Sequence, residues 1–127
     1  MTEAETSAIS RLRASELMTK NVRTATREMS LGDVAVLMRD GDMGAVPVVD
    51  DGKLIGIVTD RDIVVRGVAD SKSSDSAIGE VMTTELFSVA PDDFVFEAIR
   101  LMGDKQVRRI PVVNADGSLA GIIAMAD

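Results

Sequence analysis

Two stretches of the chain place apolar residues at the i, i+3, i+4 and i+7 positions that form one face of a helix. Each stretch opens on a helix start signal: Ser30 with Asp33 three residues later, which is the spacing of a capping box, and residues 91–93, Pro-Asp-Asp. We therefore predict a helix in each stretch, with its apolar stripe buried. The stripes are Leu31, Val34, Ala35 and Met38, and Val95, Ala98, Ile99 and Met102.

Two short apolar runs follow each predicted helix, and an Asp-Gly pair lies between them. Asp-Gly in this position is a strong hairpin signal, because both residues tolerate the positive φ angles of a tight turn. The predicted strands are Ala45–Asp50 and Leu54–Thr59 around Asp51-Gly52, and Ile110–Asn114 and Leu119–Ala124 around Asp116-Gly117. A further apolar segment precedes each helix, at Val22–Thr26 and Leu86–Val89, and a second helix is predicted over Asp60–Val68.

The same order of elements occurs twice because the chain carries an internal duplication. Landmarks recur at an offset of 64 residues, as from Met18 to Met82, and one extra residue in the second hairpin turn then shifts the later matches. The matched landmarks are Met18-Thr19 with Met82-Thr83, Leu37-Met38 with Leu101-Met102, Pro47 with Pro111, and Gly56 with Gly121. The predicted fold class is α+β, with two β-α-β-β-α repeats.

The predicted organisation is a partly disordered tail over residues 1–14, a first repeat over 15–70, a polar linker over 71–76 and a second repeat over 77–127. The second repeat reaches Asp127 at the position where the first repeat enters its last helix. We therefore expect that last helix to be missing or truncated. The sequence leaves open whether the protein naturally lacks this helix or the helix has been removed.

Composition narrows the classes of function. The net charge is −7, and a strongly acidic chain repels nucleic-acid phosphates, so we expect no nucleic-acid partner. The chain has no His and no Cys, which removes the commonest general base and the thiolate nucleophile, and we do not expect an enzyme. Its N-terminus is acidic and no run approaches the roughly 20 apolar residues that span a bilayer, so we expect a cytoplasmic location and no membrane partner.

Three segments of the first repeat resemble the CBS (cystathionine-beta-synthase) domain family: residues 17–19 (LMT), 44–50 (GAVPVVD) and 56–62 (GIVTDRD). The second repeat carries the matching segments at residues 81–83 (VMT), 107–113 (VRRIPVV) and 121–123 (GII) up to Asp127. Any one of these segments alone would be weak. Two ordered copies at matching spacing, which cover about residues 15–127, resemble a tandem CBS pair.

The resemblance implies a regulatory, ligand-sensing module (a Bateman module). Two repeats would pack sheet to sheet about a pseudo-twofold axis, and an adenine nucleotide or related adenosyl ligand would bind in the clefts between them. It also implies a homodimer formed through helices and a regulated protein partner. The expected ligand is AMP, ADP, ATP or S-adenosylmethionine, with Mg²⁺ able to accompany a nucleotide; no resident cofactor and no protein metal site are expected.

Thr59 and Asp62 are the first candidate ligand contacts. They lie where a predicted strand ends and a helix begins, so the hydroxyl can donate to a phosphate and the carboxylate can accept from both ribose hydroxyls. In the family the matching Thr and Asp are similar ligand contacts. The same spacing is also a helix capping box, and the two roles can coexist. Ala124 replaces the Thr in the second repeat while Asp127 keeps the Asp, so we expect the first site to bind better.

Arg108 and Arg109 are candidates for binding a phosphate. Neighbouring strand residues face opposite ways, so we expect one of them to face a cleft. The alternative is pairing with nearby acids such as Asp104. Gly44 and Ala45, the matching residues of the first repeat, would leave room for an adenine ring; the alternative is ordinary turn and strand packing.

We favour a ligand-binding regulatory module. The alternative is a ligand-free protein-interaction or stress-associated scaffold, which the missing hydroxyl at Ala124 favours. Phe94 and Phe96 are two residues apart at the start of a predicted helix and cannot share one face, so we expect one of them to be partly exposed. That Phe would lie either at a dimer interface or on ordinary surface.

Overall fold

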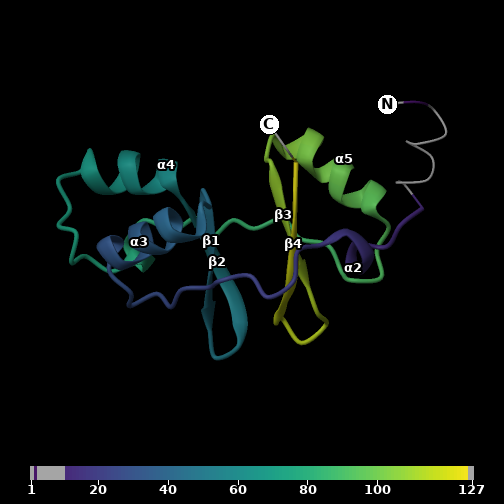
Figure 1. Cartoon of the computed structure of the whole chain (residues 1–127), viewed down its shortest axis with the longest axis horizontal. Coiled ribbons are helices and arrows are strands. Elements are labelled where there is room, and N and C mark those ends of the chain that lie inside the picture. Colours follow the sequence, from purple (N-terminus) through teal and green to yellow (C-terminus); the bar gives the residue numbers. More distant parts are fainter. Residues whose placement is uncertain (1, 3–10, 126–127) are drawn as a thin grey trace. The chain divides into compact units, whose positions relative to one another are not determined.

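The chain forms two compact units, shown in the computed structural model of Figure 1, which describes Thr2 and residues 11–125. Residues 23–86 form one unit, and the described residues among 1–22 and 87–127 form the other. Each unit is a small α+β structure, which confirms the predicted fold class. The sheet-to-sheet packing of the repeats stays a prediction.

The unit of residues 23–86 is built on one hairpin. Strands β1 (Ala45–Asp50) and β2 (Lys53–Thr59) pair antiparallel, with Ala45 opposite Thr59. The turn places Asp51 at φ 50° and Gly52 at φ 75°, as the Asp-Gly signal predicts. The inner face of β1 is buried and supplies Val46 and Val48 to the core.

Helix α3 (Leu31–Gly41) packs on this hairpin, and the Ser30 hydroxyl caps it by accepting a hydrogen bond from the Asp33 amide at 3.0 Å. The predicted stripe is partly wrong, because Ala35 is exposed while Leu37 is half-buried. The buried face of the helix therefore includes Leu37 instead of Ala35. The buried positions are Leu31, Val34 and Met38.

The second predicted helix follows β2 within its predicted bounds. It begins as α4 (Asp60–Asp62) and continues as a π-helix, η1 (Ile63–Val68). Gly67 lies against α3, where a Cβ atom would come within 2.7 Å of a Leu31 methyl group. Figure 1 shows α3 and the helix that starts at α4 on the same side of the hairpin.

Residues of the predicted linker hydrogen-bond to the first turn of α3. The carbonyl oxygens of Ser76 and Ser74 accept from the amides of Leu31 and Gly32, both at 2.9 Å. A short 3₁₀ helix, η2 (Ile78–Glu80), follows and places Ile78 in the core of this unit. Sequence reasoning missed this helix.

The other unit contains α2 (Ala14–Leu17), α5 (Val95–Lys105), β3 (Arg109–Val113) and β4 (Leu119–Ala124). Strands β3 and β4 form the second predicted hairpin, with Arg109 opposite Ala124. The α5 stripe rotates as in α3: Ile99 is exposed and Leu101 packs against the core. Sequence reasoning missed α2, and Ala14, which it assigned to the tail, is fully buried. Residues 1 and 3–10 of the predicted tail lie outside the described residues.

The predicted first strand of each repeat is reduced to one bridge residue. Ala25 pairs in parallel with Val48, and Val89 pairs in parallel with Val112. The residues around Ala25 are polar and the run at 86–89 is short, so neither segment forms a longer ladder of strand pairs. Each predicted apolar segment therefore contributes one bridge beside its hairpin, at the first β position of the predicted element order.

The opening segment of each repeat completes the hairpin of the other repeat. Thr83 and Ile57 exchange two backbone hydrogen bonds of 2.8 and 3.0 Å, and Thr19 and Ile122 exchange two of 2.8 and 3.1 Å. Helices η2 and α2, which precede these threonines, are likewise packed in the unit of the opposite repeat. In the described part of the chain, no helix is long and apolar enough to cross a membrane.

Candidate functional site

Thr59 and Asp62 meet at the end of β2 and cap each other. The Thr59 hydroxyl accepts from the Asp62 amide at 3.1 Å, and the Asp62 carboxylate accepts from the Thr59 amide at 3.0 Å. This is the reciprocal capping box that the spacing predicted. A hydroxyl that accepts one hydrogen bond can still donate its own hydrogen, so the cap leaves Thr59 able to bind an anionic oxygen.

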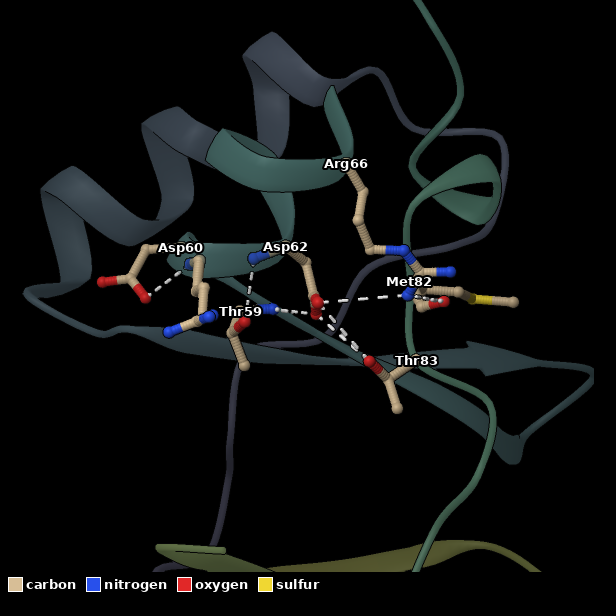
Figure 2. Close-up of polar contacts among 7 residues, drawn as sticks. Thr59, Asp60, Asp62, Arg66, Met82 and Thr83 are labelled. Carbon is tan, nitrogen blue, oxygen red and sulfur yellow. Dashed lines mark hydrogen bonds and ion pairs between the residues drawn. The ribbon is translucent and has the colours of Figure 1, made fainter. Parts of the chain in front are cut away.

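The Asp62 carboxylate is also contacted by residues that sequence reasoning did not select (Figure 2). The Thr83 hydroxyl lies 3.3 Å from Oδ2 and 3.5 Å from Oδ1, and an Arg66 guanidinium nitrogen lies 4.0 Å from Oδ1. The same nitrogen donates to the Met82 carbonyl oxygen at 3.4 Å. The signal that could have found Thr83 is the recurrence of Met-Thr at the start of both repeats.

The Asp62 side chain is only 14% exposed, whereas that of Arg66 is 50% exposed. A partly buried carboxylate with three neighbouring donors has a defined orientation. It is therefore suited to accept hydrogen bonds from a polyol such as ribose, provided that the ligand reaches the exposed part.

Gly44 and Ala45 lie beside this pair. The Gly44 carbonyl oxygen accepts from the Asp60 amide at 3.0 Å, and buried Ala45 faces Thr59 across the hairpin. The structure thus brings four predicted residues of the first repeat together. Gly44 has no side chain, and that of Ala45 is a single methyl group.

Arg108 and Arg109 occupy the matching place beside Ala124 in the other unit. Arg109 faces Ala124 across the hairpin, and the Arg108 carbonyl oxygen accepts from the Met125 amide at 2.9 Å. Arg108 is exposed and Arg109 is half-buried. Asp127, the remaining candidate of this repeat, lies outside the described residues.

Asp104, the alternative partner for these cations, binds Arg100. The Arg100 guanidinium donates to Glu97 at 2.8 Å and to Asp104 at 3.1 Å. The hydrogen bond with Glu97, supported by the charges of both carboxylates, raises the pKa of Arg100 above its ordinary value. All three side chains lie on α5.

Phe94 and Phe96 are both exposed, by 45% and 53%. We predicted exposure of one of them, and the structure exposes both. Phe94 is the residue before the first turn of α5, and the Arg13 guanidinium lies 4.0 Å from the centre of its ring. The side chain of Phe94 is therefore covered on one face by a cation.

Comparison with known proteins places this arrangement in a family. The family model of the CBS domain matches residues 14–67 and 78–127. The CBS domain-containing protein YhcV of Bacillus subtilis is 38% identical over 88% of this chain and 79% of its own length. Hypoxic response protein 1 of Mycobacterium tuberculosis is 34% identical over 90% of this chain and 80% of its own.

Two solved structures with similar folds contain adenosyl compounds. CBSX2 in complex with AMP has a TM-score of 0.78 and 27% identity, and covers 88% of this chain and 89% of its own. The CBS domain pair of protein MJ0100, in complex with 5′-methylthioadenosine and S-adenosyl-L-methionine, has a TM-score of 0.79 and 25% identity, with 89% of each chain covered. The duplicated hairpins, the capping pair after β2 and these matches agree, and the chain belongs to the CBS domain family as a tandem pair of CBS domains.

Proposed function

We propose that this CBS pair is a non-catalytic regulatory module that binds an adenine nucleotide or a related adenosyl ligand at the site of Thr59 and Asp62. The observation that carries the proposal is the mutual placement of these two side chains beside Gly44 and Ala45. The AMP complex of CBSX2 and the adenosyl complexes of MJ0100 support the same class of ligand. We expect the module to act in the cytoplasm on a protein partner.

Each group at the site has a role in this proposal. The Asp62 carboxylate accepts hydrogen bonds from the ribose hydroxyls, and the Thr59 hydroxyl donates to a phosphate oxygen. Gly44 and Ala45 leave room for the adenine ring next to backbone. Arg108 or Arg109, beside Ala124 in the other unit, is the candidate for binding a ligand phosphate, and Mg²⁺ can accompany the nucleotide.

The site of the second repeat is the weaker one in this proposal. Ala124 has no hydroxyl with which to replace that of Thr59, and a hydrogen bond to a charged group is worth about 1.5–3 kcal/mol. Its loss corresponds to binding that is roughly 10- to 100-fold weaker. Asp127 alone would then hold the ribose at that site.

Calorimetry with AMP, ADP, ATP, NAD and S-adenosylmethionine tests the proposal. Asp62→Asn is the sharper variant, because an amide oxygen can still accept from the Thr59 amide and keep the helix cap. We expect Asp62→Asn and Asp62→Ala to remove most of the binding and Asp127→Ala to change it little. Binding by Asp62→Ala as tight as that of the parent would show that Thr59 and Asp62 are only a cap.

A ligand-free scaffold is the second candidate, because Ala124 removes one hydroxyl donor and hypoxic response protein 1 is among the similar proteins. This candidate predicts no thermal stabilisation by any adenosyl compound, together with a stable protein partner. The exposed side chains of Phe96 and Ile99 on α5 support a homodimer under either proposal. A monomer in light scattering at high micromolar concentration would contradict the homodimer.

A further inference from the structure

Thr83 belongs to the second repeat in sequence, yet its hydroxyl reaches the Asp62 carboxylate of the first repeat. Its backbone is held independently of that contact, because Thr83 and Ile57 exchange hydrogen bonds of 2.8 and 3.0 Å. The backbone pairing of Thr83 with Ile57 therefore places the hydroxyl next to Asp62. Figure 2 shows it approaching the carboxylate from the side opposite to the α4 backbone.

The contacts of the carboxylate are unequal. Oδ2 accepts from the Thr59 amide at 3.0 Å, whereas the described contacts of Oδ1 are long ones, 3.5 Å to Thr83 and 4.0 Å to Arg66. A carboxylate oxygen can accept two hydrogen bonds. Oδ1 therefore retains capacity for a ligand hydroxyl.

Rotation of the carboxylate plane is a soft motion, because the last torsion of Asp has broad preferences. The hydrogen bond from the Thr59 amide to Oδ2 restrains this rotation, but a single hydrogen bond still permits a range of orientations of the plane. The Thr83 hydroxyl lies nearly equidistant from both oxygens, at 3.3 and 3.5 Å, which are longer than ordinary O–H···O bonds. A weak contact shared by both oxygens defines the plane without using up the acceptor capacity of Oδ1.

We propose that Thr83 is a positioning residue for the ligand site: it holds the plane of the Asp62 carboxylate so that Oδ1 is presented to the ribose hydroxyls. The inference rests on the proposed function, because it assigns Asp62 to the ribose. A carboxylate that is already oriented loses less conformational freedom when the ligand binds. The affinity is therefore higher for ligands that carry the ribose hydroxyls.

Thr83→Val tests this inference, because valine keeps the shape of threonine and the backbone bonds to Ile57 but lacks the hydroxyl. The probes are AMP and 2′,3′-dideoxyadenosine 5′-monophosphate, which lacks both ribose hydroxyls. We expect Thr83→Val to weaken AMP binding about tenfold, the change expected for one weakened hydrogen bond to a charged group, and to leave binding of the dideoxy compound unchanged. Thr83→Ser should restore AMP binding. Thr84→Val, at the exposed neighbouring threonine, is the matched control and should bind AMP like the parent.

Two results would overturn the inference: unchanged AMP affinity in Thr83→Val, or an equal loss for both probes, which indicates a general structural role. Failure of the proposed function gives a different result, because the parent chain would then bind no AMP. The role of Thr83 in ribose binding would then be excluded as well. In that case the carboxyl ¹³C chemical shift of Asp62, which responds to the hydrogen bonds that the carboxylate accepts, decides the positioning role. A shift that changes in Thr83→Val but not in Thr84→Val supports it, and an unchanged shift refutes it.

Discussion

Gly56 leaves open the space that the sulfur of Met82 occupies. A Cβ atom on Gly56 would lie 2.8 Å from that sulfur and 3.0 Å from the Thr83 carbonyl oxygen. Gly121 makes the same close approach to the opening segment of the first repeat, at 2.7 Å from the Met18 sulfur. These two glycines allow each hairpin to accept the Met-Thr segment of the other repeat.

Gly56→Ala should therefore destabilise the protein by about 1–3 kcal/mol, because the added methyl group overpacks against Met82 and the Thr83 backbone. Urea denaturation measures the change. Gly103→Ala is the matched control: Gly103 lies within α5, where an added Cβ atom would meet open space, and alanine there should stabilise the helix by about 0.5–1 kcal/mol. Equal stability of Gly56→Ala and the parent would contradict the close packing.

Ile78→Ala should cost about 2–5 kcal/mol, because the side chain is fully buried. Although Ile78 belongs to the second repeat in sequence, it packs in the core cluster with Val46 and Val58. Hydrogen exchange should therefore accelerate more at the amides of β1 and β2 than at those of β3 and β4. The opposite pattern would contradict the exchange of opening segments. Val64→Ala, at a 58% exposed position of the same unit, should change stability by less than about 0.5 kcal/mol.

Phe94→Leu should destabilise the protein by about 0.5–1 kcal/mol through loss of the cation–π contact with Arg13. Phe96→Leu is a close control on the same helix start and should stay within about 0.5 kcal/mol of the parent. Thermal unfolding at several protein concentrations separates this effect from self-association. Equal losses in the two variants would show that the Arg13 contact contributes nothing measurable.

Ser30→Ala should cost about 1 kcal/mol, because the first turn of α3 loses the acceptor for the Asp33 amide. Ser30→Asp should keep most of the stability, since an aspartate both caps a helix and favours its positive N-terminal end. The two variants are compared by urea denaturation. A loss as large in Ser30→Asp as in Ser30→Ala would indicate that the cap is not the cause.

Local signals predicted the elements that depend on neighbouring residues. The turn at Asp51 and Gly52, the cap at Ser30 and the helix after Thr59 all rest on contacts within a few residues, and all are confirmed. The buried arc of α3 was predicted less well, because Ala35 and Leu37 flank the same stripe and only packing against the hairpin selects between them. Helix periodicity alone does not show which side of the stripe faces the hairpin.

The contacts of Asp62 depend on residues far along the chain and could be predicted only in part. Its bond to Thr59 follows from the three-residue spacing of a capping box. Its contact with Thr83 depends on the pairing of Thr83 with Ile57, which lies 26 residues earlier in the chain. The repeat of Met-Thr indicated that these residues matter, but no local pattern named the hairpin that receives them.

The exchange of opening segments also bears on how a duplicated chain of this kind could arise. Neither hairpin of this chain takes the Met-Thr segment of its own repeat, so an ancestor with one repeat and the same packing would need a second copy to complete its sheet. Gene duplication would then join two polypeptides that already depended on each other. Identical copies made from one gene cannot differ from each other, whereas covalently joined repeats can. That freedom is what allows one repeat to keep Thr59 while the other carries Ala124.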